Sequence, residues 1–168
     1  MAYDYNLFLD KIKSTLVANA TALAASLSVN YPTLTSDSIA IGAPENLPRG
    51  IDRYPYIIIN AKNTDEEFEQ LGVSSTGIAR TVNNSVALYS FINVMSDSQD
   101  SDKQARTLAR NINTVFRANY EISGADGWDK VIAETTIHGK DAYKEPGQDD
   151  VYTSATRIEL SFTKYNVS

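Results

Sequence analysis

The stretch SDKQARTLARNINTVFRANY, residues 101–120, predicts an amphipathic helix packed on a β-sheet. Ser101 followed by Gln104 fits a capping box, in which each side chain bonds the backbone N–H of the other residue. Apolar residues then recur at spacings of three and four, which places them on one side of a helix. The predicted buried stripe comprises Ala105, Leu108, Ala109, Ile112, Val115, Phe116 and Asn119. The basic residues of the helix fall largely off its centre; they are Lys103, Arg106, Arg110 and Arg117.

An earlier helix is predicted from Asn6 to about Leu27, with Asp4 or Asn6 as its cap. Its apolar residues also recur at helical spacing, and Pro32 falls where a helix should already have ended. The stripe comprises Phe8, Ile12, Leu16, Ala20, Leu23 and Leu27.

Three segments after this helix predict strands. Residues 39–41 form a short apolar trio typical of an edge strand, and residues 54–59 crowd β-branched and aromatic side chains together. Apolar character on both faces favours a central position for the second segment. Residues 78–82 and 85–95 predict further strand, broken by Asn83 and Asn84.

Two closing strands alternate between apolar and polar side chains. Val131, Ala133 and Ile137 share one face, and a polar loop at residues 140–150 follows. In the last strand Ile158, Leu160 and Phe162 face one way; Arg157, Glu159, Ser161 and Thr163 face the other. The element order predicts an α+β fold in a single domain over residues 1–168. Its sheet is expected to be mixed but mainly antiparallel, with an N-terminal helix and a second helix packed on it.

Composition narrows the function classes. The chain has 168 residues and a formal net charge of -6, which argues against sequence-independent nucleic-acid binding and docking on an anionic membrane. Absence of cysteine excludes disulfides and thiolate chemistry. No secretory signal or membrane span is expected from the sequence, so we expect a protein that stays soluble inside a cell or a particle assembled there.

Reactive groups are scarce. His138 is the single histidine, and no partner at a known spacing would make it a general base. Two acidic runs, residues 65–69 and 149–150, lack the ligand pattern of a calcium loop and are best interpreted as solvated. We therefore expect no catalytic residue, no metal site and no cofactor, and the chain is predicted not to be an enzyme.

The whole layout resembles the tail terminator (tail completion) proteins of long-tailed bacteriophages. The resemblance covers nearly the full chain and rests on element order and hydropathy. Its elements are the N-terminal helix, the Pro-containing strand at 54–59, the apolar strand at 85–95, the helix at 102–120 and the closing strand at 156–165. It implies a structural virion protein, assembled in the host cytoplasm, that forms a ring, usually a hexamer. Such a ring caps the tail tube, stops its polymerisation and meets the head connector, while DNA passes through its lumen without specific binding.

Two sets of residues are candidates for roles in such a ring. The acidic arm comprises Asp65, Glu66, Glu67 and Glu69; in the ring lumen it would repel passing DNA. Candidate subunit contacts are Arg106, Arg110, Arg117, Tyr143 and Tyr152, since tyrosine and arginine are enriched at interfaces.

Other interpretations stay open at the sequence level. Within the same kind of particle, the chain could be a head-tail adaptor, a neck protein or a tail-tube subunit. From another class, it could be a small binding module or an enzyme of unknown substrate, with His138 in a polar pocket.

Overall fold

The computed structural model describes residues 4–27, 34–43, 55–68, 80–95, 98–134, 143–144 and 151–167. The helices are α1 (Tyr5–Ala18), α2 (Ala20–Leu23), the 3-10 turn η1 (Ser36–Ser38) and α3 (Ser98–Ala118). The strands are β1 (Ile39–Ile41), β2 (Tyr56–Phe68), β3 (Arg80–Met95), β4 (Lys130–Glu134), β5 (Tyr143–Lys144) and β6 (Val151–Val167).

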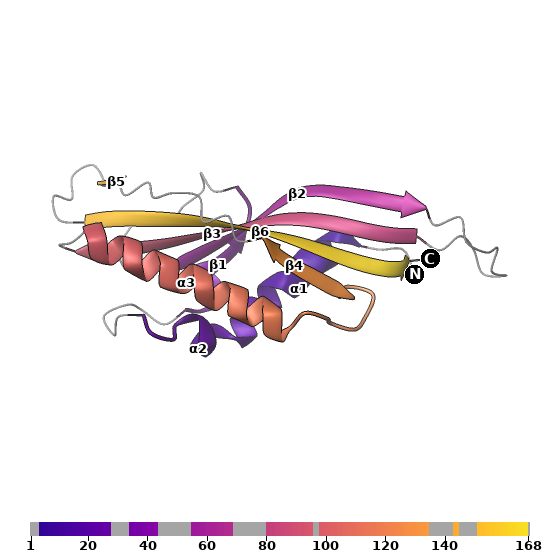
Figure 1. The fold of residues 1–168 in the computed structure, drawn as a ribbon, viewed down its shortest axis with the longest axis horizontal. Coiled ribbons are helices and arrows are strands. Elements are labelled where there is room, and N and C mark those ends of the chain that lie inside the picture. Colours follow the sequence, from indigo (N-terminus) through magenta and orange to yellow (C-terminus); the bar gives the residue numbers. More distant parts are fainter. Residues whose placement is uncertain are drawn as a thin grey trace.

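The strands form one mixed sheet in the order β1-β2-β3-β6-β4, with β5 also paired to β6. Only the β1–β2 pair among these described strands is parallel; the others are antiparallel. In Figure 1 the sheet is elongated, and α1 and α3 lie along the same side of it. The predicted α+β class, the mainly antiparallel sheet and the packed second helix are thereby confirmed.

Two predicted strands are confirmed in their places in the sheet, although the one predicted at 54–59 runs from Tyr56 to Phe68. Residues 39–41 form the edge strand β1, and β2 begins at Tyr56 in the interior of the sheet. Ile57 and Ile59 join one hydrophobic cluster while Tyr56 and Ile58 join another, so this part of β2 is buried on both faces.

The predicted strand break at Asn83 and Asn84 is wrong, because β3 runs through both residues. β3 lies between β2 and β6, so both neighbours supply ladder hydrogen bonds that outweigh the poor strand propensity of asparagine. The side chains also find partners across the sheet. Asn83 Oδ1 accepts from Thr163 Oγ1, and Asn84 Oδ1 accepts from Thr64 Oγ1, each at 3.0 Å.

The helix predicted at 101–120 is present, but it begins three residues earlier, at Ser98, and ends at Ala118. Ser101 therefore lies within the first turn, and the predicted capping box at Ser101 is wrong. The predicted stripe is confirmed, since its apolar members from Ala105 to Phe116 are all buried. The four basic residues lie away from it: Lys103, Arg106, Arg110 and Arg117 are exposed.

The first helix is interrupted at Asn19 instead of continuing to Leu27. The Asn19 side-chain amide donates to the Thr15 carbonyl at 2.8 Å, which takes the acceptor that the backbone N–H of Asn19 would use in a continuous helix. That N–H bonds Leu16 O instead, at 3.1 Å. The end of α2 is then held by α3, because the Asn111 amide donates to the carbonyls of Leu23 and Ala25.

The predicted cap at Asp4 is confirmed: its Oδ1 accepts from the backbone N–H of Asn6 at 2.9 Å and of Leu7 at 3.3 Å. Replacing Asp4 with alanine removes both acceptors and is expected to lower the free energy of unfolding by about 1 kcal/mol. Urea denaturation followed by circular dichroism measures this loss. Asp10→Ala, an exposed position on the same helix, is the matched control, and an equal loss there would contradict the capping role.

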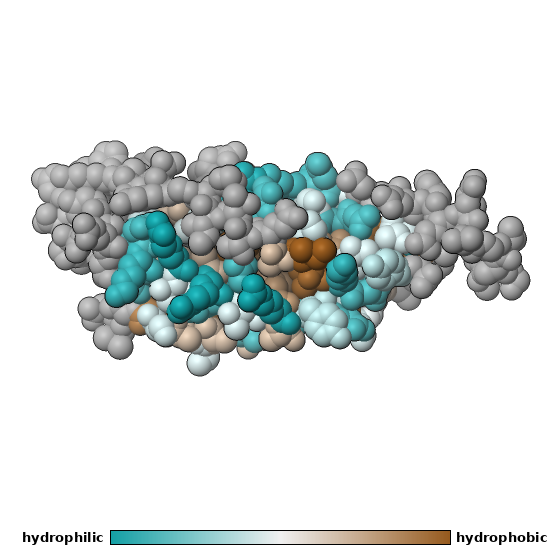
Figure 2. Space-filling view, viewed as in Figure 1, coloured by the Kyte–Doolittle hydropathy of each residue, from teal (hydrophilic) through white to brown (hydrophobic). Residues whose placement is uncertain are grey.

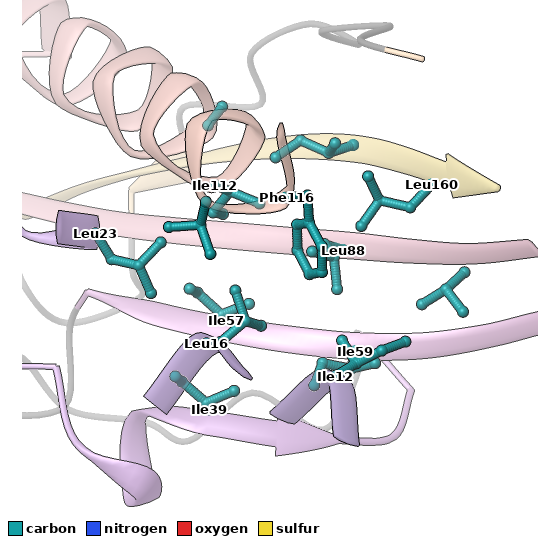
Figure 3. Close-up of a cluster of buried hydrophobic side chains, with 14 of the residues drawn as sticks. Ile12, Leu16, Leu23, Ile39, Ile57, Ile59, Leu88, Ile112, Phe116 and Leu160 are labelled. Carbon is teal, nitrogen blue, oxygen red and sulfur yellow. The ribbon is translucent and has the colours of Figure 1, made fainter. Parts of the chain in front are cut away.

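The main core lies between the sheet and the two long helices. Figure 3 shows Ile12 and Leu16 of α1, Ile57 and Ile59 of β2, and Ile112 of α3 around the same buried space. Aromatic rings fill one part of the core: Trp128 lies 4.8 Å from Phe162, 6.1 Å from Phe8 and 6.2 Å from Phe116 between ring centroids. The predicted inward face of the last strand is confirmed; Ile158, Leu160 and Phe162 are buried.

Tyr5 stacks on Phe8 at the margin of this core, with 5.8 Å between ring centroids. Burial raises the pKa of the Tyr5 phenol, and the Thr64 side chain offsets part of that rise. The neutral phenol is therefore favoured in the folded state. The free energy of unfolding is thus highest below about pH 10, the pKa of tyrosine in an unfolded chain, and falls as the pH rises toward the pKa of the folded state. Tyr5→Phe is expected to flatten this alkaline decline in urea titrations between pH 9 and 11. The exposed control Tyr120→Phe should leave it unchanged, and an unaltered decline in Tyr5→Phe would refute the assignment.

Some sequence predictions fall outside the described residues. They concern Ile137, Glu69, His138 and most of the loop at 140–150. The two described residues of that loop form the strand β5, so the predicted loop is wrong there, because β6 supplies a ladder for them. Within the described ranges, no helix combines the length and the hydropathy needed to cross a bilayer.

Candidate subunit-interface site

The outer side of α3 carries a basic stripe, which we define as Lys103, Arg106, Arg110 and Arg117. At 3.6 residues per turn the four positions fall within an arc of about 60°, opposite the buried stripe, and span about 21 Å along the axis. Figure 2 shows hydrophilic side chains following α3 across the visible face of the molecule. The stripe holds four of the 15 Lys and Arg residues in a chain of net charge -6.

Most of this positive charge has no ion-pair partner among the residues that the structure describes. Arg106 Nε bonds Asp102 Oδ2 at 3.2 Å, one turn away on the same helix. Lys103, Arg110 and Arg117 have no ion-pair partner within the part of the chain that the structure describes. These exposed cations are hydrated by solvent and are not held by ion pairs within the described residues. The stripe can therefore bind an acidic surface.

The acidic arm belongs to the hairpin of β2 and β3. Asp65, Glu66 and Glu67 lie near the end of β2, paired in register with Asn83, Val82 and Thr81 of β3. Three of the four predicted residues are therefore placed on a paired strand at one end of the sheet; Glu69 lies outside the described residues.

The same part of β2 has an open edge. β1 pairs only with Ile57, Ile58 and Ile59, and among the described strands none pairs with residues 60–68 on the side away from β3. This edge is about 26 Å long, and its side chains from Ala61 to Thr64 are exposed. A register shift between Ala61 and Asn63 places one extra residue, Lys62, in the edge. Open edges favour pairing with another chain, while bulges and lysines restrict that pairing to a partner that fits.

Tyr143 and Tyr152 lie on the neighbouring strands β5 and β6 at the other end of the sheet, one register position apart. β5 pairs Tyr143 with Thr153 and Lys144 with Tyr152 of β6. β6 continues from there to Val167, which pairs with Arg80 beside the acidic arm. Through β3, Asp65 and Glu66 align with Thr163 and Lys164 of β6. The two tyrosine positions and the acidic arm are thus separated by about 40 Å of strand and cannot belong to one local site.

The sheet face away from the helices is polar where Lys62 bonds Glu159, with Nζ and Oε1 3.0 Å apart. Arg157 also bonds this carboxylate, and its guanidinium lies over the Tyr89 ring. A depression of about 140 Å³ borders the pair, lined by Lys62, Asn63, Ser85 and Glu159 among others. Its charges are already paired, and within the described ranges no group of three or more His, Asp and Glu could hold a metal ion.

Two features of the surface were not among the predicted contacts. Lys103 was grouped with the three arginines off the centre of the helix but was not predicted as a contact, although spacings of three, four and seven residues place all four on one side. The open edge of β2 could not be foreseen, because it depends on how far β1 extends beside it.

No protein-family model matches the chain, and no curated protein sequence is significantly similar to it.

Proposed function

We propose that the chain is a structural protein of a phage virion, a tail terminator that assembles into a ring on the end of the tail tube. In this role the ring stops tube polymerisation and joins the tail to the head connector. The tail-tube protein, the head connector and further copies of the chain are its partners. DNA passes through the ring during ejection, without specific binding.

The open edge of β2 is the observation that carries this proposal. Residues 60–68 offer backbone N–H and C=O groups along a strand that is paired with β3 on its other side, and a second copy can pair with such an edge. The opposite edge of the sheet differs from it, since there β4 and β5 pair with separate parts of β6. An interface between unlike surfaces is heterologous. A heterologous interface generates a closed ring when the rotation from one subunit to the next brings the last copy back to the first.

The element order supports the same role. The strand at 54–59, the long strand at 85–95, the helix at 102–120 and the closing strand at 156–165 each have a counterpart in β2, β3, α3 and β6. The resemblance to tail terminators rests on these elements.

Deleting the gene in the phage that encodes the chain tests the role, with electron microscopy of lysates as the measurement. A terminator deletion is expected to yield overlong tubes and unattached heads, and expression from a plasmid should restore normal tails. Heads that fail to close would assign the chain to the adaptor or neck class, and absence of tubes would assign it to the tube. Normal, infectious particles would overturn a virion role.

A further inference from the structure

We propose that the open edge of β2 pairs with β4 of a second copy of the chain, so that one continuous sheet runs through neighbouring subunits. The inference rests on the ring proposed above and names the two strands that join its copies. The pairing uses residues 61–64 of β2 and the whole of β4, Lys130–Glu134.

β4 has an open edge of its own. It pairs with β6 on one side, and among the described strands none pairs with it on the other. Just before β4, the backbone N–H and C=O of Trp128 bond those of Ile122, so this closed part of the edge ends where β4 begins. The Lys130 and Ile132 side chains are exposed, Ile132 to 45 %. The outer side of β4 can therefore accept a further strand.

The two open edges lie at the same level of the sheet. Strand register aligns Ile132 of β4 with Asn63 of β2. In the next row, Val131 aligns with Thr64. β3 and β6 lie between the two edges, which are therefore on opposite sides of a four-stranded section and about 14 Å apart. A copy displaced sideways past this section brings its β2 edge level with β4 of the first copy.

The strand directions also agree. The pairs β2–β3, β3–β6 and β6–β4 are all antiparallel, so β4 runs opposite to β2. A second copy in the same orientation therefore adds its β2 antiparallel to β4 and continues the alternation of the section. Its helices then lie on the same side of the joined sheet as α1 and α3 of the first copy (Figure 1). Copies joined in this way repeat head to tail, as a ring requires.

The side chains of the two edges match on each face. Val131 and Ala133 pack against the main core, so Ile132 lies on the opposite face of β4. Ala61 of β2 is aligned with Ala133 and shares its face, but it is exposed. The joined sheet places Ala61 of one copy on the same face as Val131 and Ala133 of its neighbour. It also covers part of Ile132, which a single copy leaves in water.

Self-pairing around a twofold axis is the alternative for each edge. Two β2 edges would bring together two Lys62 side chains and two register shifts, because the shift of β2 lies between Ala61 and Asn63. β4 has no register shift along its pairs with β6, so it offers a regular ladder. Unlike pairing joins the irregular edge to a regular one and brings a single Lys62 to each contact.

The chain has no cysteine, so introduced cysteines report on the contact directly. The test variant is Asn63→Cys with Ile132→Cys, and the two single variants are the controls for self-pairing. Thr114→Cys with Ile132→Cys is the matched double control, since Thr114 is exposed on α3, outside both edges. The assembled protein is treated with a bis-maleimide linker of about 7 Å, which tolerates a stagger of two residues between the paired strands. Denaturing gels then measure the linked products.

The test variant is expected to give a ladder of products larger than a dimer, because each copy is linked on both sides. Thiols held on adjacent strands have an effective concentration in the millimolar range, so linking should be at least about tenfold faster than in the double control at micromolar chain concentration. Each single variant should remain largely monomeric.

Hydrogen exchange on the wild type checks the contact without any substitution. Assembly should slow the exchange of backbone amides at 61–64 and 130–134, because a new ladder bonds them. The exposed turn at 123–125 should exchange at an unchanged rate.

Rings that form without a ladder in the test variant and without slower exchange at both edges would overturn the contact while leaving the proposed function standing. Efficient dimer formation by either single variant would assign that edge to self-pairing and would also overturn the contact. A wild type that forms no ring, alone or on tails, would remove the ring and the contact together.

Discussion

Replacing Trp128 with alanine is expected to lower the free energy of unfolding by about 4 kcal/mol, a large share of the about 5–15 kcal/mol typical of a domain. Trp128 is fully buried and contacts the rings of Phe8, Phe116 and Phe162, which come from α1, α3 and β6. Truncation leaves a cavity where these three elements meet. It also removes the indole donor that bonds Asn119 O at 3.0 Å.

Urea unfolding followed by far-ultraviolet circular dichroism measures this loss, because the chain has one tryptophan and the variant lacks its fluorescence. Trp128→Phe keeps a ring in the core and is expected to cost about 1–2 kcal/mol, chiefly for the lost hydrogen bond and volume. Ile132→Ala, at an exposed position on β4, should change stability by less than about 0.5 kcal/mol. If Trp128→Ala lowers the free energy of unfolding by less than about 1 kcal/mol, the packing of Trp128 between α1, α3 and β6 is contradicted.

Replacing Gly127 with alanine is expected to cost about 3 kcal/mol, at the upper end of the overpacking range. A Cβ at this position would lie 2.0 Å from the carbonyl oxygen of Ile122 and 2.8 Å from its carbonyl carbon. Both atoms are backbone, so the clash cannot be relieved by rotating a side chain. The same carbonyl accepts from Trp128 N at 3.0 Å, and Ile122 N donates to Trp128 O at 2.8 Å, so any shift weakens the bridge that holds Trp128 in place.

Urea denaturation monitored by tryptophan fluorescence measures this effect, and the emission of Trp128 should also shift to longer wavelength if the ring is displaced toward water. Ser123→Ala, exposed in the same turn, is the matched control and should change stability by less than about 0.5 kcal/mol. An alanine variant as stable as the wild type would show that this close approach is absent from the protein in solution.

Hydrophobic periodicity predicted the parts of the fold that depend on one face of one element. The stripe on α3 from Ala105 to Phe116 and the alternation of Ile158, Leu160 and Phe162 on β6 are both buried as expected. These patterns are local, because a helix or strand can bury one side only if its apolar residues repeat with the period of that element.

The departures arise where a partner distant in sequence decides the outcome. Asn83 and Asn84 would end an isolated strand, yet β2 and β6 provide both ladder bonds and side-chain partners for them. At Asn19 a side-chain bond to the Thr15 carbonyl ends α1, and apolar periodicity contains no signal for that competition. Ser98 begins α3 before the first periodic apolar residue, so the pattern located the helix without locating its first turn.

The candidate interface was also predictable from the sequence only in part. Exposure of Arg106, Arg110 and Arg117 followed from their position opposite the buried stripe. The placement of Tyr143 beside Thr153, and the open edge of β2, depend on strand register and on the short length of β1. Neither is encoded in a local pattern, so the sequence could propose contact residues but could not say which of them lie together.

Electron microscopy of the purified chain, alone and after incubation with tails assembled without it, tests the proposed ring most directly. The proposed function predicts a closed ring of identical copies, seated at one end of the tail tube and absent from tails that never met the protein. Single copies in solution together with unchanged density at both ends of the tube would contradict it.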